Sequence, residues 1–290
     1  MGIWLSDGWE DYEVLSAGGG EKLERWGGYV LLRPDPQAIW PMEPGALSRV
    51  KVHAHYHRSP AGGGHWEMLK DLPEQWRIRY GELTFVVRPT GFKHTGLFPE
   101  QAVNWDFMAR KIREAGRPVR VLNLFAYTGG ATLACALAGA EVVHVDAAKG
   151  MVAWAKENLY ASGLERKPVR FLVDDCMKFV LRERRRNRAY HGVVMDPPSY
   201  GRGPAKEMWK LEDRLFSLVE AIMPVMADDP LFFIINSYTT GLSPLVLENI
   251  LRLTIGGRFA GRIEARQIGL PVRDRGLVLP CGSAGRWEAQ

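Results

Sequence analysis

The sequence has few cysteines and no long apolar run. Cys135, Cys176 and Cys281 are too few and too scattered for a disulfide framework, and no Cys-x-x-Cys pair indicates zinc. Apolar stretches such as residues 231–235 are far shorter than the roughly 20 residues of a membrane-spanning helix. Residues 1–9 lack the basic start and apolar middle of a secretory signal. We therefore expect a cytoplasmic protein with reduced thiols and no membrane contact.

The composition is that of an ordinary globular protein. Of the 290 residues, 46% are hydrophobic and 24% are charged, which argues against both a disordered and a fibrous chain. This length suffices for one or two domains. The net charge of +5 is compatible with a polyanionic partner, but many proteins that bind no nucleic acid carry as much. The charge alone does not identify a partner, and the sequence does not indicate an oligomeric state.

The first 90 residues predict a small β-rich module. Glycine and proline break this part of the chain into short pieces, so no long amphipathic helix fits. Short apolar or alternating runs lie between the breaks, at residues 29–32, 50–56, 76–80 and 83–87. Tyr80-Gly81-Glu82-Leu83 is placed as the turn of a hairpin. We assign residues 1–90 to this module.

Residues 91–290 are predicted to form an α/β domain. Strands are expected at residues 119–125, 141–145, 169–173, 192–195, 231–235, 259–268 and 276–279, the last two joined by a turn containing Pro271. Helices are expected at residues 131–137, 151–160, 177–186, 208–226 and 243–253. Alternating strands and helices are typical of a mostly parallel, doubly wound sheet with helices on both faces.

Polar residues follow four of the predicted strands. The first strand leads into residues 123–130, Asn-Leu-Phe-Ala-Tyr-Thr-Gly-Gly, where glycine permits a close approach of ligand to backbone. Asp146, Asp174, Asp175 and Asp196 come just after the next three strands. Parallel strands end at one edge of a sheet, so these side chains are expected around one crevice, with Asp146 placed to hold ribose hydroxyls. The alternative for the glycine pair alone is a helix start that requires close packing.

The missing motifs decide between nucleotide ligands. The sequence contains neither the G-x-G-x-x-G turn nor the G-x-x-x-x-G-K-[ST] loop that hold pyrophosphate. A crevice lined with carboxylates repels phosphate and favours a cation. The sulfonium of S-adenosylmethionine is a cation attached to an adenosine. The pattern therefore favours this methyl donor over NAD or ATP.

The fourth strand runs into Asp196-Pro197-Pro198-Ser199-Tyr200. Two prolines hold the backbone extended, which can direct the Asp196 carboxylate and the Pro197 carbonyl at one amino group. Tyr200 is then placed to stack on a planar base. We predict these three residues to be catalytic; the alternative is a proline-rich loop with a solvent-facing tyrosine.

Together these segments resemble the class I, Rossmann-like S-adenosylmethionine-dependent methyltransferases. Residues 93–101, Lys-His-Thr-Gly-Leu-Phe-Pro-Glu-Gln, further resemble a segment that precedes the catalytic domain in bacterial large-subunit ribosomal RNA methyltransferases of the cytosine-5 and guanine-N7 type. The resemblance implies seven strands with the last antiparallel, RNA binding and ribosomal RNA as the partner. It places Asp146 on the ribose, Asp174 and Asp175 near the adenine, and Phe98, Glu100 and Gln101 over the cofactor. The full implied cofactor set is Lys93, Thr95, Phe98, Glu100, Gln101, Asn123, Phe125, Ala126, Tyr127, Thr128, Gly129, Asp146, Ala147, Asp174, Asp175 and Asp196.

One departure from that family favours a nitrogen acceptor. Methylation of pyrimidine carbon 5 needs a cysteine thiolate, which the similar cytosine-5 enzymes carry just after the fifth strand. This chain has Asn236-Ser237-Tyr238-Thr239 there, and Cys281, after the last predicted strand, is the one plausible substitute. The Asp-Pro-Pro-Ser-Tyr segment instead resembles a motif of nitrogen methyltransferases. Carbon 5 of cytosine, a protein, a small molecule, and an inactive cofactor-binding module remain alternatives.

Two further clusters are interpreted as structural. His53, His55 and His57 share a strand face and His65 is near, but we find no acidic or cysteine partner spaced to complete a metal site. We therefore expect no metal. Five arginines within residues 182–188 indicate either a phosphate-contacting surface or a solvated helix end.

Overall fold

The computed structural model describes residues 2–59, 63–91, 93–202 and 208–290. These residues form two compact units, each built from separate stretches of chain. The α/β unit comprises Met1–Trp4, Val103–Ile268 and Gly282–Gln290, and the β-rich unit comprises Leu5–Ala102 and Gly269–Cys281. Each compact unit combines stretches from both sides of residue 90. The predicted division into residues 1–90 and 91–290 therefore stays a prediction.

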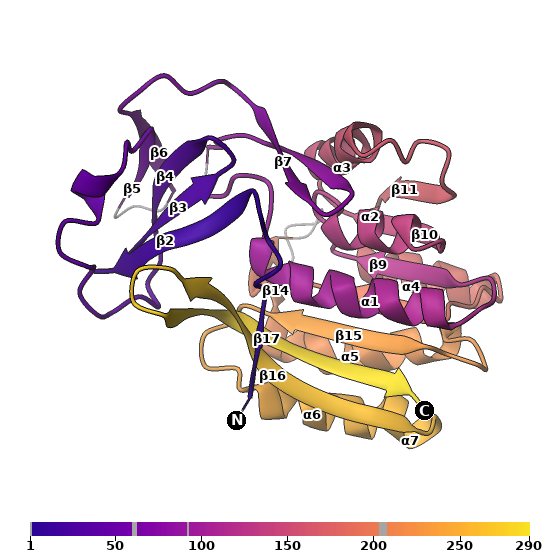
Figure 1. The fold of residues 1–290 in the computed structure, drawn as a ribbon. Helices are drawn as coiled ribbons and strands as arrows, with labels where there is room; N and C mark the ends of the chain where they lie inside the picture. The colour runs from indigo at the N-terminus through magenta and orange to yellow at the C-terminus, as the bar shows by residue number, and fades with distance from the viewer. Residues whose placement is uncertain (1, 60–62, 92, 203–207) are drawn as a thin grey trace. The chain divides into compact units, whose positions relative to one another are not determined.

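The α/β unit contains a seven-stranded sheet (Figure 1). The strand order is β11-β10-β9-β12-β15-β17-β16, and the first five are parallel. The last strand, β17, runs antiparallel to β15. This topology confirms the predicted fold class. The strands are β9 (Arg120–Leu124), β10 (Glu141–Asp146), β11 (Val169–Val173), β12 (Gly192–Met195), β15 (Phe232–Ser237), β16 (Gly261–Val272) and β17 (Leu277–Ala289).

Helices cover both faces of this sheet (Figure 1). One face carries α1 (Ala102–Glu114), α2 (Gly130–Leu137) and α3 (Lys149–Ala161). The other carries α4 (Cys176–Arg185), α5 (Leu211–Ile222), α6 (Pro244–Leu253) and α7 (Ile255–Arg258), with the 3-10 turn η3 (Met223–Val225) after α5. In the described part of the chain, no helix combines the length and apolar character needed to cross a membrane.

Helix α1 is absent from the sequence prediction, although its pattern is helical. Ala102, Trp105, Ala109 and Ile112 are buried at spacings of three and four residues, as on the inner face of a helix. The helix packs closely on the sheet's glycine turn: a Cβ added to Gly130 would lie 2.4 Å from the Trp105 ring. The close packing that was the alternative explanation for this glycine is therefore real.

The β-rich unit is built around a second run of strands. The end of β16 pairs with β2, and the order continues β2-β3-β4-β5-β6. A separate hairpin joins β7 (Trp76–Tyr80) to β8 (Leu83–Val87) through the predicted turn. The other bounds are β1 (Ile3–Leu5), β2 (Tyr12–Gly18), β3 (Glu21–Trp26), β4 (Tyr29–Pro34), β5 (Ala54–Arg58), β6 (Gly64–Met68) and the 3-10 turns η1 (Leu47–Arg49) and η2 (Pro99–Gln101).

The predicted β-rich character of the N-terminal region is confirmed, with differences in detail. Strands β2, β3 and β6 were not predicted, and the strand expected at residues 50–56 begins only at Ala54. Gly19 and Gly20, read only as breaks, form the tight β2–β3 turn at φ values of 62° and 81°. Such left-handed backbone favours glycine, so these residues connect two strands of one hairpin.

Three predictions at the C-terminal side are wrong. Residues 208–210 form β14 (Met208–Lys210), antiparallel to β13 (Tyr200–Arg202), so helix α5 begins at Leu211 instead of Met208. Pro271 lies within β16, and residues 273–276 make the turn. Cys281 lies inside β17 and does not follow it. Pro280 is tolerated there because pairing of β17 with β15 begins only at Ser283.

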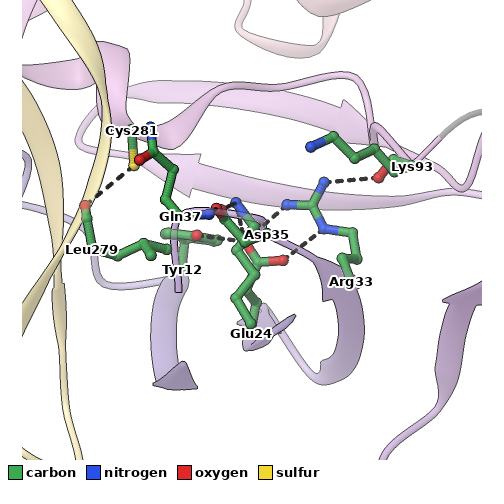
Figure 2. A network of polar contacts seen from close by, with 9 residues as sticks. Tyr12, Glu24, Arg33, Asp35, Gln37, Lys93, Leu279 and Cys281 are labelled. Atoms are coloured by element: carbon green, nitrogen blue, oxygen red, sulfur yellow. Dashed lines mark hydrogen bonds and ion pairs between the residues drawn. The ribbon is translucent and has the colours of Figure 1, made fainter. Parts of the chain in front are cut away.

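A buried network of charged residues connects strands β2, β3 and β4 of the β-rich unit (Figure 2). Arg33 donates from Nε to Glu24 Oε2 at 2.6 Å and from Nη2 to Glu24 Oε1 at 2.8 Å, and Tyr12 donates to the same carboxylate at 2.6 Å. These side chains are almost fully buried. Burial alone raises the pKa of Glu24, but the Arg33 guanidinium and Lys22 ammonium outweigh it and hold that pKa at about 2. Glu24 is therefore ionised at neutral pH.

Candidate cofactor-binding and active site

The loop after β9 is held in an unusual conformation. Phe125 and Tyr127 have positive φ values of 54° and 51°, and Gly129 follows at 89°. For a residue other than glycine such backbone costs about 1–3 kcal/mol and clusters at functional sites. The loop amides offset this cost, because Tyr127 N donates to Asp146 Oδ2 at 2.8 Å and Ala126 N to the Val145 carbonyl at 3.1 Å. The loop is thus fixed to the end of β10.

Asp146, the last residue of β10, is the centre of this arrangement. Its two oxygens accept from the Tyr127 and Ala148 amides, each at 2.8 Å. Burial raises the pKa of Asp146, while these two amides act in the opposite direction. A carboxylate has about four lone-pair sites, so each oxygen still has capacity for one further donor. The side chain can both brace the loop and accept two ligand hydroxyls.

Asp174 and Asp175, after β11, have structural partners. The Asp174 amide donates to the Asp146 carbonyl at 3.0 Å, which joins the ends of β10 and β11. Asp174 forms an ion pair with Arg182 of α4. Asp175 is the N-cap of α4 and accepts from the Lys178 amide at 2.8 Å. The expected grouping of Asp174 and Asp146 is present, but Arg182 makes this edge less negative than the sequence suggests.

The segment after β12 is braced on several sides. The Asp196 amide donates to the Leu124 carbonyl at 3.3 Å, beside the start of the β9 loop. Further along, Trp209 Nε1 donates to the Pro198 carbonyl at 2.6 Å. Thr239 Oγ1 donates to Ser199 Oγ at 2.8 Å. Hydrogen bonds at Asp196, Pro198 and Ser199 therefore hold this segment in place.

Tyr200 begins β13 and is 65% exposed, with its strand partner Lys210 on β14. The exposed ring agrees with either of the two interpretations of this residue, base stacking or a solvent-facing tyrosine. Its role as a catalytic residue stays a prediction.

Trp209 lies beside the candidate site, a position that the sequence analysis missed. Its ring lies 5.5 Å from that of Phe125, at an interplanar angle of 50°. Together with its bond to the Pro198 carbonyl, this contact links the β9 loop to the segment after β12. The sequence assigned Trp209 to a helix, and only the β13–β14 pairing places it here.

Several residues predicted to bind the cofactor form hydrogen bonds to other residues of the α/β unit. Asn123 is buried, and its Nδ2 donates to Thr132 Oγ1 at 2.9 Å. The Thr128 carbonyl accepts from Asn158 Nδ2 at 2.8 Å. Ala147, next to Asp146, is exposed. Asn123 and Thr128 fix the strand and the loop, and their direct contact with a cofactor stays a prediction.

The remaining residues predicted to bind the cofactor lie in the β-rich unit. The Lys93 carbonyl accepts from Arg33 Nη1 at 2.9 Å, so the buried network of Figure 2 anchors this segment. Burial, followed by the charge of Lys22, lowers the pKa of Lys93 to about 8. Thr95 is fully buried, and its hydroxyl has no hydrogen-bond partner in the described ranges. Phe98 precedes η2, in which Glu100 and Gln101 are buried. Their predicted position over the cofactor is not tested by these contacts.

Comparison with known proteins decides the family. The sequence model of the S-adenosylmethionine-dependent methyltransferases matches residues 39–271, well over half of the 290-residue chain. The chain belongs to this family. S-adenosylmethionine is accordingly its cofactor.

A crystal structure of the SAM-dependent methyltransferase from Agrobacterium tumefaciens is similar over the whole chain. It is 35% identical with a TM-score of 0.94, and the match covers 100% of this chain and 94% of that one. A putative methyltransferase complexed with SAH has a TM-score of 0.77 over 98% of this chain and 76% of its own, at 18% identity. The second likeness shows the fold alone.

The similar curated sequences include Ribosomal RNA large subunit methyltransferase K/L from Shewanella baltica. It is 37% identical over 124 residues, which are 42% of this chain and 16% of that protein. The present methyltransferase therefore spans only a small part of this curated relative.

The hydrogen-bond acceptors of Asp146 fit the adenosyl cofactor. The ribose carries neighbouring hydroxyls, and Asp146 retains acceptor capacity on both oxygens after bonding the Tyr127 and Ala148 amides. The loop that these bonds hold also packs closely on α3, because a Cβ added to Gly129 would lie 3.1 Å from Ala155 Cβ. Asp146 would thus hold the ribose, as the resemblance to the family implies.

All three cysteines of this methyltransferase have a pKa above the ordinary value. Burial raises the pKa of Cys135, Cys176 and Cys281. Cys176 lies under the site, where its Sγ accepts from the Phe125 amide at 3.3 Å. Cys281, partly buried in the β-rich unit, donates to the Leu279 carbonyl at 3.4 Å (Figure 2). A low pKa, which thiolate catalysis needs, is absent from all three.

Proposed function

We propose that this methyltransferase methylates a base nitrogen of ribosomal RNA. The observation that carries the proposal is the braced Asp196–Tyr200 segment at the edge where Asp146 and the β9 loop lie. The printed name of the Shewanella relative supports ribosomal RNA as the acceptor. An acceptor of this kind also implies a cytoplasmic protein.

The proposed chemistry needs no covalent enzyme intermediate. Bound S-adenosylmethionine would supply an electrophilic methyl group: the acceptor nitrogen forms a bond to the methyl carbon as the sulfonium S–CH3 bond breaks, S-adenosylhomocysteine leaves, and the nitrogen releases one proton to solvent. Asp196 and the Pro197 carbonyl accept hydrogen bonds from the acceptor's amino group and keep the nitrogen lone pair directed at the methyl carbon. Tyr200 stacks on the base and restrains its plane. Alignment of two reactants in this way can lower a barrier by about 7–11 kcal/mol.

A base in structured RNA has to leave its stack to reach such a site, at a cost of a few kcal/mol. Stacking on Tyr200, worth about 1–3 kcal/mol per base in single-strand binders, would offset part of this cost. The exposure of the Tyr200 ring makes it available for that contact.

The arginine-rich end of α4 supports an RNA acceptor. Arg182 and Arg186 pair with Asp174 and Glu183, whereas Arg184, Arg185 and Arg188 are exposed. Exposed arginines at a helix C-terminus complement the helix dipole and can also contact phosphate. In the proposed complex they contact the RNA backbone.

The acceptor is tested with labelled S-adenosylmethionine. The methyltransferase is incubated separately with ribosomal RNA, intact ribosomal subunits, DNA and a protein fraction, and the labelled product is digested and identified. We expect label in ribosomal RNA as an N-methylated base. Label in carbon-5 methylcytosine would overturn the nitrogen assignment and make Cys281→Ser the next variant to assay. Label confined to protein, DNA or small molecules would contradict the RNA acceptor, and no label anywhere would favour an inactive binding module.

A further inference from the structure

The hairpin of β5 and β6 gathers imidazole and carboxylate groups on one face. Strand alternation places His55 and His57 on the same side of β5. In the antiparallel register, Glu67 lies opposite His55 and His65 lies opposite His57. Residues directly opposite each other in such a pair point to the same face. Four potential metal ligands therefore share one side of two neighbouring strands.

The ligand atoms of three of them are already close together. One nitrogen each of His55 and His57 and an oxygen of Glu67 lie within 4.8 Å of one another. His57 Nε2 is 2.7 Å from Glu67 Oε2, and the His55 and His57 ring centroids are 3.9 Å apart. The three ligand atoms therefore form one compact group.

Two more side chains surround this group. His65 stacks on His57, with ring centroids 5.4 Å apart and an interplanar angle of 29°. Glu21 of β3 also contacts the group, with its Oε1 2.5 Å from His55 Nε2. The side chains are 20% exposed for His55, 38% for His57 and 52% for Glu67, so an ion can reach them from solvent.

From the sequence we found no acidic side chain spaced to join these histidines. The structure places the Glu67 carboxylate beside His57. Its position depends on the β5–β6 register, and β6 itself was not predicted. The signal available in the sequence was the alternation of His65 and Glu67, two residues apart like His55 and His57.

We propose that His55, His57 and Glu67 bind one divalent transition-metal ion, for which Zn²⁺ is the probe. Two imidazoles and one carboxylate suit zinc and its neighbours, whereas calcium and magnesium prefer oxygen ligands. Water completes the fourth position, and the carboxylates of Glu67 and Glu21 offset the dication's charge. Because its ligands come from both β5 and β6, the ion joins the last two strands of this sheet.

Only small movements are needed to form the site. Zinc bonds to nitrogen and oxygen are about 2.0–2.2 Å long, so neighbouring ligands of a tetrahedral ion lie about 3.3 Å apart. The three ligand atoms are within 4.8 Å of each other, and Glu67 already contacts His57 at 2.7 Å. The ion bonds to the His57 nitrogen and the Glu67 oxygen in place of their present contact.

Titration calorimetry with zinc chloride tests the proposal. The full chain without a polyhistidine tag is first freed of metal with a chelator. We expect saturable binding of one Zn²⁺ per chain, with His57→Gln and Glu67→Gln each weakening binding by at least about tenfold. Glu82→Gln is the matched control, because Glu82 is an exposed residue in the turn of the other hairpin, β7–β8. This control is expected to bind like the unaltered chain.

Cobalt binding and a thiol control exclude other sites. Co²⁺ in the unaltered chain is expected to give visible absorption bands of a four- or five-coordinate nitrogen and oxygen site, which His57→Gln removes. Cys281→Ser is expected to leave Zn²⁺ binding unchanged. The proposal is overturned if the chain shows no saturable Zn²⁺ binding, if both ligand variants bind like Glu82→Gln, or if Cys281→Ser abolishes binding. Circular dichroism checks that the variants fold; the exposure of Glu67 makes its substitution the safer of the two.

Discussion

Replacing Asp196 with alanine is expected to lower kcat for methyl transfer by about 10²–10³-fold, the loss typical of removing one preorganised electrostatic contact to a reacting group. The Asp196 amide remains bonded to the Leu124 carbonyl, so the backbone after β12 keeps its path. What disappears is the carboxylate that orients the acceptor nitrogen. We therefore expect affinity for S-adenosylmethionine to change by less than about tenfold, because Asp146 and the β9 loop hold most of the cofactor.

The measurement is transfer of labelled methyl from S-adenosylmethionine to ribosomal RNA, with cofactor affinity followed by calorimetry. Asp228→Ala is the control, since Asp228 is an exposed aspartate before β15. It is expected to transfer methyl groups at the unaltered rate. Undiminished product formation by Asp196→Ala would contradict the mechanism, and an equal loss in the control would assign the effect to folding.

Replacing Glu24 with glutamine is expected to reduce the free energy of unfolding by about 3–5 kcal/mol, as when one partner of a buried ion pair is removed. The substitution leaves the Arg33 guanidinium buried without its counter-charge. Glu43→Gln is the control, because Glu43 pairs with Arg275 at the surface and such pairs contribute about 0–1 kcal/mol. Denaturant unfolding at neutral pH measures the free energy of unfolding of both variants. Similar stability of the two variants would show that the buried network contributes little.

The Glu24–Arg33 pair is also expected to make the free energy of unfolding depend on pH. The folded pKa of Glu24 is about 2, below its ordinary value of 4.5, so its stabilising contribution is present above the unfolded pKa. That contribution is lost as the pH falls from about 4.5 towards 2. The stability difference between the unaltered chain and Glu24→Gln is therefore expected to shrink across this window. A difference that stays constant down to pH 2 would contradict the assigned pKa.

The parallel sheet was the most predictable part of the fold. Its strands β9, β10, β12 and β15 are mostly buried, so each appears in the sequence as a short apolar run, whereas the edge strand β11 is only partly buried. Their carboxyl ends lie at one edge of a parallel sheet, where the Asp174 amide bonds to the Asp146 carbonyl and the Asp196 amide bonds to the Leu124 carbonyl. The local hydrophobic pattern of the sequence was therefore sufficient to predict these strands.

Features that depend on strand register were not predictable in the same way. Trp209 reaches Phe125 only because residues 208–210 pair with β13, whereas the sequence around it continues smoothly into α5. Likewise, Glu24 and Arg33 meet across β3 and β4, and Glu67 meets His57 across β5 and β6. Each pair joins residues on different strands, and single-strand periodicity carries no information on the partner.

The ion pair between Asp174 and Arg182 changes the expected charge of the cofactor crevice. The sequence counts Asp174 as a negative group of the cofactor crevice, but the structure pairs it with Arg182 eight residues later on α4. The helix brings the two side chains together, and Asp175 is used to cap that helix. Asp146 is therefore the carboxylate at this edge on which the cofactor assignment chiefly depends.

Calorimetric titration of the full chain with S-adenosylmethionine and, separately, with NAD tests that assignment most directly. The account predicts one S-adenosylmethionine per chain, no detectable NAD binding, and at least about tenfold weaker S-adenosylmethionine binding by Asp146→Asn, which loses the charge and one of the two amide acceptors. Tight binding of NAD with none of S-adenosylmethionine, or undiminished S-adenosylmethionine affinity in Asp146→Asn, would contradict it.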